Sequence, residues 1–425
     1  MFDSDEEFEA SCGQGPNKAV GKFLAALPAS LRDTAVPLAN FTKANFLGRG
    51  TFGRVYKGTA PDGSSVALKK LSLHQFNNQR HALALKDSVR EVQVLASLQH
   101  RNIAQLRHVA LGISDVYLAI ELCPVQVLQL VEVDLPPAVI KSLTWQLLTG
   151  LRYVHGRGLI HRDVKTDNLM LKQGTLKIGD FGSAASVDQK LWTPQVVTLW
   201  YRPPEILLGC PLQTCAIDIW SAGCVVAELL LGEVLFRGHS ELSQINRIVD
   251  LLGTPTSRDW PGLSDLPVME CMSLNERERR FERELAPVVH TTALLRLLAR
   301  MFAYNPEGRL TADECLAADY FGEQPPMATE IEVDTFCTRL SAKLERALES
   351  NSDDDDDEDD DEGEECDDGI AHAYGAPDGA GDRRAATGGP GRGGNNNNNS
   401  KNCTGQNRMM KFSRVRKKLR LDVTE

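Results

Sequence analysis

Two short polar motifs constrain this chain more than any other feature. The first is His161-Arg162-Asp163-Val164-Lys165-Thr166-Asp167-Asn168, and the second, after a short predicted hairpin, is Asp180-Phe181-Gly182. Transfer of a phosphoryl group needs in-line positioning and neutralisation of developing charge, and these side chains suit both needs. We expect Asp163 to accept the proton of a substrate hydroxyl and Lys165 to stabilise the transferring phosphate. Asn168 and Asp180 offer oxygen ligands for Mg²⁺, a hard cation.

Each of these residues alone is more often structural than catalytic. The probability that all of them occur in this order and spacing by chance is roughly one in a hundred or less. The lysine at position 165 is typical of transfer to serine or threonine rather than to tyrosine. The two motifs therefore predict an enzyme that phosphorylates serine or threonine.

A glycine-rich segment, Gly48-Arg49-Gly50-Thr51-Phe52-Gly53, lies earlier in the chain. Glycine lets the backbone approach phosphate oxygens closely. Alone the pattern is weak evidence, because such a segment is an ordinary glycine turn in roughly half of cases. Dinucleotide-binding folds also use the same glycine spacing, before a helix. Here the strand-like run Arg54-Val55-Tyr56-Lys57 follows instead. We therefore expect a hairpin lying over a nucleotide.

The run Val66-Ala67-Leu68-Lys69 places a lysine at the end of an apolar strand. Such a lysine reaches the α- and β-phosphates when a carboxylate holds it, and Glu91 on the following predicted helix is the candidate. The alternative is a surface lysine and a solvated glutamate. We expect Lys70 to be a surface lysine of that kind.

The patterning divides the chain into parts of different character. Alternating apolar residues predict strands first, a helix follows from about Leu85 to Leu98, and later segments are helical at 139–155, 216–231 and 240–252. This order predicts an α+β fold with two lobes. We expect an N-terminal extension over 1–40, a domain over 41–321 with lobes at 41–121 and 125–321, a C-terminal extension with a short helix over 322–350, and a disordered tail over 351–425.

The net charge of −11 arises from that tail, where fourteen Asp or Glu residues lie between Asp353 and Asp368. Such a run is usually a solvated, self-repelling segment. The functional alternatives are a lure for basic partners such as histones, or a contact with the basic segment Arg414–Arg420 of the same chain. That basic segment suits nuclear import, whereas specific nucleic-acid binding is not expected because the patch is short and aromatic residues are sparse.

The apolar runs and the cysteines indicate the cellular compartment of the protein. No run of eighteen apolar residues and no secretory signal are present, so we expect no membrane span. The ten cysteines form no Cys-x-x-Cys pair, which argues against a disulfide framework or a zinc site. These features favour the nucleus, the cytoplasm or both.

From about Phe41 to Phe321 the chain resembles the eukaryotic protein kinase family. Besides the motifs above, Pro203-Pro204-Glu205 lies where the family has Ala-Pro-Glu, and Asp218 resembles the aspartate that anchors the catalytic loop. The resemblance implies a bilobal protein kinase fold, with a small antiparallel sheet and one helix in the first lobe and a larger, mostly helical second lobe. It also implies a buried ion pair between Glu205 and Arg309, and the use of ATP and Mg²⁺.

Within that family the chain is similar to the cyclin-dependent kinases. The evidence is Val196-Val197-Thr198-Leu199-Trp200-Tyr201-Arg202, Leu252-Gly253-Thr254-Pro255 and Trp260-Pro261-Gly262. The segment Asp87-Ser88-Val89-Arg90-Glu91 and the run from Tyr320 to Pro325 resemble the PITSLRE branch. No Thr-x-Tyr pair lies between Gly182 and Glu205, which argues against a MAP kinase. The resemblance implies a cyclin-like partner and a role in cell-cycle or transcription control.

The resemblance also assigns residues to the ATP site. Glu121 and Leu122 belong to the hinge, and Ile120 lies behind the adenine. The expected ATP-binding residues are Leu47, Gly48, Arg49, Gly50, Thr51, Phe52, Gly53, Val55, Ala67, Lys69, Glu91, Ile120, Glu121 and Leu122.

Regulation and substrate choice follow by the same resemblance. Thr193 is the expected activating phosphosite, with Arg90 and Arg162 to receive its phosphate, while Ala185 replaces the usual third arginine. Thr51 is a second modifiable residue. Thr198 is expected near Asp163, and Val197 with Arg202 is expected to build a pocket that accepts proline after the phosphorylated Ser or Thr.

Two other hypotheses stay open at this point. One is a kinase of the same superfamily that needs no cyclin, to which Ala185 lends support. The other is an inactive kinase-fold scaffold, which has about one chance in twenty because Lys69, Glu91, Asp163, Asn168 and Asp180 are all present.

Overall fold

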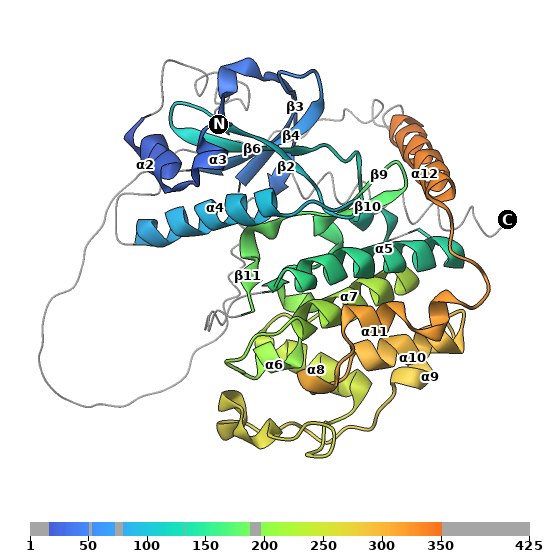
Figure 1. Ribbon diagram of the computed structural model, residues 1–425. Coiled ribbons are helices and arrows are strands. Elements are labelled where there is room, and N and C mark those ends of the chain that lie inside the picture. The colour runs from blue at the N-terminus through green and yellow to red at the C-terminus, as the bar shows by residue number, and fades with distance from the viewer. Residues whose placement is uncertain (1–16, 51–52, 73–79, 132, 188–196, 351–425) are drawn as a thin grey trace, which may run out of the picture. The chain divides into compact units, whose positions relative to one another are not determined.

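The computed structural model describes residues 17–50, 53–72, 80–131, 133–187 and 197–350. Contacts divide the chain into a compact unit over 1–340 and a second unit over 341–425, of which only the end of one helix is described. Within the first unit, a sheet-rich part precedes a helical part (Figure 1). The predicted two-lobed α+β architecture is therefore confirmed.

The first lobe is built on a six-stranded sheet with the order β1-β5-β6-β4-β3-β2. Strands β2 to β6 pair antiparallel with one another, whereas β1 runs parallel to β5. Helix α4 (Arg80–Ser97) lies between β4 and β5 in sequence, and it lies beside the sheet in Figure 1. The strands are β1 (Val36–Pro37), β2 (Thr42–Gly50), β3 (Gly53–Thr59), β4 (Ser65–Ser72), β5 (Leu106–Leu111) and β6 (Asp115–Glu121).

Residues before Phe41 belong to this lobe more closely than the sequence indicated. Helix α2 (Lys18–Ala26) buries Val20 and Phe23 against the sheet and α4, and the short helix α3 (Ala29–Arg32) leads to β1. The small lobe thus holds another packed helix besides the one predicted.

The second lobe is built around two long buried helices, α5 (Pro137–Gly156) and α7 (Ala216–Leu231). Helix α5 starts with Pro137 at its first position, where a missing N–H costs nothing. Helix α7 ends at Gly232, which adopts a φ of 74° and donates its N–H to the Glu228 carbonyl. The other helices are α6 (Pro204–Leu207), α8 (Glu241–Leu252), α9 (Phe281–Leu285), α10 (Thr292–Met301) and α11 (Ala312–Leu316).

Short strands connect the long helices and carry the polar motifs. A three-stranded sheet joins β7 (Val125–Gln126), β9 (Leu169–Lys172) and β10 (Thr175–Ile178). Strands β8 (Leu159–Ile160) and β11 (Ala185–Ser186) pair antiparallel. The first motif follows β8, and the second lies between β10 and β11.

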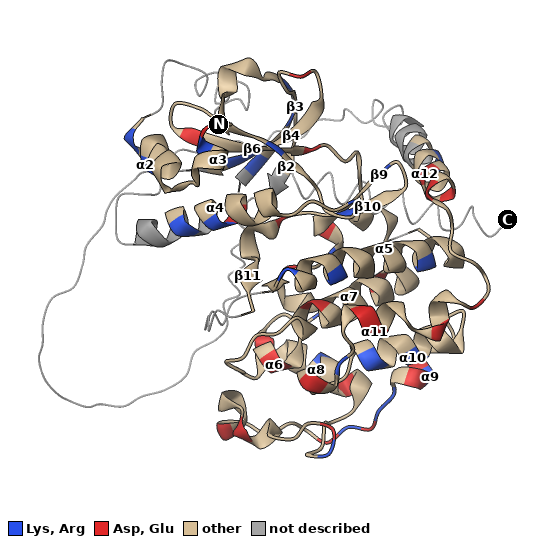
Figure 2. Ribbon diagram, viewed as in Figure 1, with Lys and Arg blue, Asp and Glu red and all other residues tan. Residues whose placement is uncertain are grey.

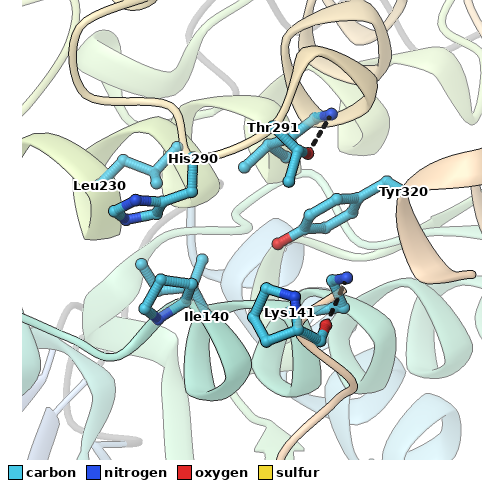
Figure 3. A pocket seen from close by; sticks show the side chains of 9 residues that line it. Ile140, Lys141, Leu230, His290, Thr291 and Tyr320 are labelled. Atoms are coloured by element: carbon cyan, nitrogen blue, oxygen red, sulfur yellow. Dashed lines mark hydrogen bonds between the residues drawn. The ribbon is translucent and has the colours of Figure 1, made fainter. Parts of the chain in front are cut away.

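A buried lysine fixes the segment that leaves the second lobe. Lys141 of α5 is 1 % exposed, and its Nζ donates to the carbonyls of Glu323 (2.6 Å) and Pro325 (2.7 Å). Its ammonium also lies 4.7 Å from the ring centroid of Tyr320, and Figure 3 shows the two side chains beside one another. Beyond this point, helix α12 (Glu330–Ser350) begins so close to Gly174 that a Cβ there would collide with the Glu330 carbonyl.

Basic and acidic positions both occur along α8, α9 and the segment between them, whereas the charged positions of α10 are basic (Figure 2). Arg279 and Glu282 form one such exposed pair at 2.8 Å, and Arg280 and Glu284 another at 3.0 Å. Pairs of this kind add little to stability, typically about 0–1 kcal/mol. Among the described residues, no helix is both long and apolar enough to cross a bilayer.

Candidate active site

The glycine-rich segment forms the hairpin that the sequence predicted. Strands β2 and β3 pair from Thr42 with Thr59 to Gly50 with Gly53, and Gly48 lies opposite Val55. Because a strand and not a helix follows the glycines, the dinucleotide-fold alternative was wrong. Leu47 is half exposed at the start of this segment, while Thr51 and Phe52 lie outside the described residues.

The strand lysine meets the predicted carboxylate. Lys69 Nζ lies 2.7 Å from Glu91 Oε1 and 2.8 Å from Asp180 Oδ1. All three side chains are largely buried, and burial disfavours the charged ammonium, but the two carboxylates outweigh it and raise the pKa of Lys69. Lys69 therefore stays charged and joins β4, α4 and the Asp-Phe-Gly motif.

The prediction for the neighbouring lysine was wrong. Lys70 is 5 % exposed and its Nζ lies 3.1 Å from Asp115 Oδ2, which is itself buried. Successive residues of a strand point to opposite faces of its sheet, so Lys70 faces away from Lys69. The face expected to meet solvent is instead covered by the apolar residues Leu38 and Phe41, which pack on this sheet.

The predicted hinge begins with Glu121, the last residue of β6, and continues with Leu122. Ala67 pairs with Ile120 across β4 and β6, and the Glu121 N–H donates to the Gln105 carbonyl at 2.8 Å. The Glu121 carboxylate lies 3.0 Å from Lys172 and 3.2 Å from Lys177. The Glu121 side chain is thus committed to these two lysines, so that any nucleotide contact of Glu121 has to be made by its backbone.

Asp163 lies at the centre of a second group of polar side chains. Its Oδ1 accepts a hydrogen bond from the Thr198 hydroxyl at 2.6 Å, and its Oδ2 accepts from Asn168 Nδ2 and Lys165 Nζ, each at 2.9 Å. Burial by itself would raise the pKa of Asp163, but the hydrogen bond from Thr198 and the Lys165 charge lower it below its usual value. Asp163 is therefore ionised at neutral pH.

Backbone geometry brings the two groups together. The Gly179 N–H donates to the Asn168 carbonyl at 2.8 Å, which places Asp180 beside Asn168. Asp180 adopts a left-handed φ of 55°, a conformation that non-glycine residues rarely adopt outside constrained sites. The amide nitrogen of Asn168 points to Asp163, so its oxygen is turned the other way. Asn168 and Asp180 thus present oxygen atoms of the kind that Mg²⁺ binds.

Asp218 anchors the catalytic loop as the sequence predicted. This fully buried carboxylate accepts the N–H groups of His161 and Arg162, each at 2.8 Å, and also His155 Nε2 at 2.8 Å. Burial opposes its charge, but the hydrogen bonds from His155 and His161 outweigh burial and lower the pKa of Asp218. Arg162 takes a φ of 65° at this point, and the anchor holds that conformation.

The segment after position 196 closes the site. Val197 has a φ of 69°, and its carbonyl accepts from Arg202 Nε at 3.1 Å and Nη2 at 2.9 Å. Arg202 also lies 2.5 Å from Glu241 of α8. Farther along, Glu205 and Arg309 form the expected buried pair, with nitrogen–oxygen distances of 2.7 and 2.9 Å.

One buried polar group was missed in the sequence. Tyr201 donates to Glu228 Oε2 at 2.7 Å, and the Thr166 hydroxyl lies 3.3 Å from Glu228 Oε1. Burial raises the pKa of Glu228 to about 7, although both hydrogen bonds oppose that rise. A glutamate inside the apolar second half of helix α7 was the available signal, because such a residue needs a buried partner.

The expected regulatory residues are only partly described. Thr193 lies outside the described residues, and Arg90 is half-buried on α4. Arg162 Nε donates to the Ser183 carbonyl at 2.6 Å, and its Nη1 donates to Gln213 at 2.9 Å. Ala185, which replaces the usual third arginine, is buried in β11.

The comparisons agree with this geometry. The protein kinase domain family matches residues 41–321. Human cyclin-dependent kinase 10 is 38 % identical over 330 residues, covering 75 % of this chain and 90 % of that protein. The CTD kinase subunit alpha of Schizosaccharomyces pombe is 37 % identical over 68 % of this chain and 50 % of its own length.

A solved structure is also similar to this chain. The crystal structure of the yeast RNA Pol II CTD kinase CTDK-1 complex contains a chain that is 31 % identical, with a TM-score of 0.63. The similarity covers 69 % of this chain and 96 % of that one. The chain belongs to the cyclin-dependent kinase family and is a serine/threonine protein kinase.

Proposed function

We propose that this kinase transfers the γ-phosphate of ATP to serine or threonine residues that are followed by proline, in cell-cycle or transcription control. The observation that carries the proposal is the joint arrangement of the ionised Asp163 carboxylate and the Val197 carbonyl held by Arg202. The first supports the chemistry and the second supports the choice of substrate.

Asp163 is the base in this proposal. Its Oδ1 is oriented by Thr198 and its Oδ2 by Asn168 and Lys165, so the carboxylate has one fixed orientation toward an incoming hydroxyl. Its lowered pKa keeps it unprotonated at neutral pH. Lys165 stays within reach of the same position and stabilises the transferring phosphate.

Asn168 and Asp180 are the proposed ligands of Mg²⁺, and the donor set fits because both offer side-chain oxygens. Bound Mg²⁺ would neutralise charge that develops on the phosphate oxygens. Lys69, fixed by Glu91 and Asp180, aligns the phosphates of ATP. The hairpin of β2 and β3 covers them, and the hinge at Glu121 and Leu122 holds the adenine through its backbone.

The preference for proline follows from the Val197 carbonyl. Arg202 occupies that carbonyl with two hydrogen bonds, so a substrate residue packed there loses water from its N–H without gaining this acceptor. A buried donor without a partner costs about 1–3 kcal/mol. Proline has no N–H and avoids this cost.

A cyclin-like partner is part of the proposal. Glu91 lies on α4, and phosphate alignment requires Glu91 to stay within bonding distance of Lys69. A protein that docks on α4 and favours this position shifts the population toward the active state. The relatives support a cyclin partner, because one of them, human cyclin-dependent kinase 10, is named for its dependence on cyclin.

Phosphorylation of Thr193 and Thr51 also belongs to the proposal, with Arg162 and Arg90 as receivers of the Thr193 phosphate. The buried Ala185 leaves one cation fewer than relatives have, so we expect weaker dependence on that phosphate. Localisation in the nucleus, the cytoplasm or both follows from the basic segment near the C-terminus.

The preference for proline is tested with two peptides that differ only in Ser-Pro against Ser-Ala. We expect kcat/KM to be about tenfold higher or more for Ser-Pro. Arg202→Met should reduce that ratio, because it frees the Val197 carbonyl. Glu241→Gln is the matched control, since it touches Arg202 but leaves its bonds to Val197 intact. Equal kcat/KM values for both peptides in the natural protein would refute the preference.

A further inference from the structure

The N-terminal helix α2 is fixed to the small lobe at its first residue. The Asn17 side chain accepts from the N–H groups of Ala19 (2.9 Å) and Val20 (3.1 Å), which caps the helix. The Asn17 N–H donates to the Ile113 carbonyl at 2.7 Å, in the turn between β5 and β6. The start of α2 is therefore tied to the sheet by both side chain and backbone.

The far end of α2 is fixed as well. Arg32 Nη2 donates to the carbonyl of Leu27, the C-cap residue of α2, at 2.9 Å. The chain then enters β1, where Val36 pairs with Ala110 of β5. Since both ends are bound to the lobe, α2 has little freedom to leave it.

The buried face of α2 meets the helix that carries Glu91. Val20, Phe23 and Leu27 are at most 2 % exposed and share one apolar cluster with Val89 and Val92 of α4. Leu71, Val109, Val116 and Leu118 of the sheet complete the cluster. Glu91 lies between Val89 and Val92 in sequence, so the α4 residues on either side of the carboxylate pack in the cluster that α2 completes.

We propose that α2 is an intramolecular brace that holds α4 with Glu91 in bonding distance of Lys69, and that Phe23 is a positioning residue for phosphoryl transfer. The part that concerns phosphoryl transfer rests on the proposed function. Displacing α4 would open the cluster and expose the ring of Phe23 to water, which is unfavourable. The brace therefore biases the equilibrium of α4 toward the position in which Lys69 and Glu91 bond.

The small lobe offers a matched control at Phe41. This residue is 5 % exposed and belongs to a second apolar cluster, with Leu38 and Tyr56, on the other face of the sheet. Among its described members, that cluster contains no residue of α4. Shortening Phe41 thus removes comparable packing from the same lobe without touching α4.

The experiment compares Phe23→Leu with Phe41→Leu in the full chain, purified with its co-isolating partners. The first readout is hydrogen exchange in peptides covering α4 (Arg80–Ser97), which needs no activity. We expect exchange there to rise about fivefold or more in Phe23→Leu and to stay near the natural level in Phe41→Leu. Equal exchange of α4 in the two variants would overturn the brace.

The second readout is phosphate transfer to a Ser-Pro peptide. Phe23→Leu should lower kcat about tenfold. In a protein that already carries Glu91→Gln, the bond between Lys69 and residue 91 is already weakened, so adding Phe23→Leu should lower kcat little further. Full additivity of the two changes would contradict a positioning role. If α4 exchanges faster in Phe23→Leu but the natural protein transfers no phosphate, the brace is upheld and the proposed function is refuted. If Phe23→Leu does not fold, Val20→Ala replaces it, with the same outcomes.

Discussion

The Thr198 hydroxyl donates a 2.6 Å hydrogen bond to Asp163, and so joins the proposed substrate-binding segment to the proposed base. Thr198→Ala should lower kcat about 10- to 100-fold, because Asp163 loses the group that orients one of its oxygens. Thr198→Ser keeps a hydroxyl and should stay close to the natural rate. Thr149→Ala, which removes a hydroxyl from α5 away from the site, is the control. Steady-state kinetics with a peptide substrate distinguish these outcomes, and a serine variant as slow as the alanine variant would contradict the role.

The adjacent lysines of β4 have separate carboxylate partners and separate roles. Glu91→Gln should lower kcat/KM for ATP about 10- to 100-fold, because Lys69 loses a charged partner at 2.7 Å. Asp115→Asn should leave kcat unchanged and lower the free energy of unfolding by about 3 kcal/mol, because the buried Lys70 loses a charged partner at 3.1 Å. Kinetics and urea unfolding of both variants provide the test, and a catalytic loss in Asp115→Asn would overturn the division of roles.

The pair of Glu205 and Arg309 is completely buried. Arg309→Met should lower the free energy of unfolding by about 3–5 kcal/mol, because the Glu205 charge is then buried without a partner. Adding Glu205→Met should restore part of that loss. Arg279→Ala, at an exposed pair, should change stability by about 0.5 kcal/mol or less. Denaturant unfolding measures all of these changes, and a double variant less stable than Arg309→Met alone would contradict the account.

Glu228 should make stability depend on pH. Its folded pKa of about 7 lies above the usual 4.5, so between these values the folded state keeps a proton that the unfolded state releases. Unfolding stability should therefore fall by about 3 kcal/mol as pH rises through this window, and level off above it. Glu228→Gln should remove this contribution. Urea unfolding from pH 4.5 to 8 measures the free energy of unfolding of both proteins. The amount by which the natural protein exceeds the variant should shrink or reverse toward high pH. A difference in this free energy that does not depend on pH would contradict the raised pKa of Glu228.

The fold and the centre of the site followed from the sequence because the polar motifs are short and local. Asp163, Asn168 and Asp180 lie on a loop and hairpin whose spacing fixes their arrangement, and Asp218 and Arg309 were found by resemblance. What was missed depends on packing between distant segments. Lys70 was misjudged because nothing local to β4 reveals that residues before position 42 cover the outer face of the sheet.

Helix α2 was missed for a similar reason. Its amphipathic pattern spans only nine residues, too few for an isolated helix to be stable in water. It forms because Phe23 and Val20 are buried by the sheet and α4, which is a tertiary effect. Tyr201 and Glu228 likewise meet only after the chain has folded, so the sequence indicates that Glu228 needs a buried partner but not that Tyr201 supplies it.

The most direct test of the central claim is transfer of labelled γ-phosphate from ATP to a Ser-Pro peptide, comparing the natural protein with Asp163→Asn, each purified with its co-isolating partners. We expect transfer by the natural protein and a rate at least about 1,000-fold lower in the variant, with unchanged folding, because the base is lost while the hydrogen bonds that hold its neighbours largely remain. Equal transfer by both proteins, or none by the natural protein with a bound partner and phosphorylated Thr193, would contradict the account.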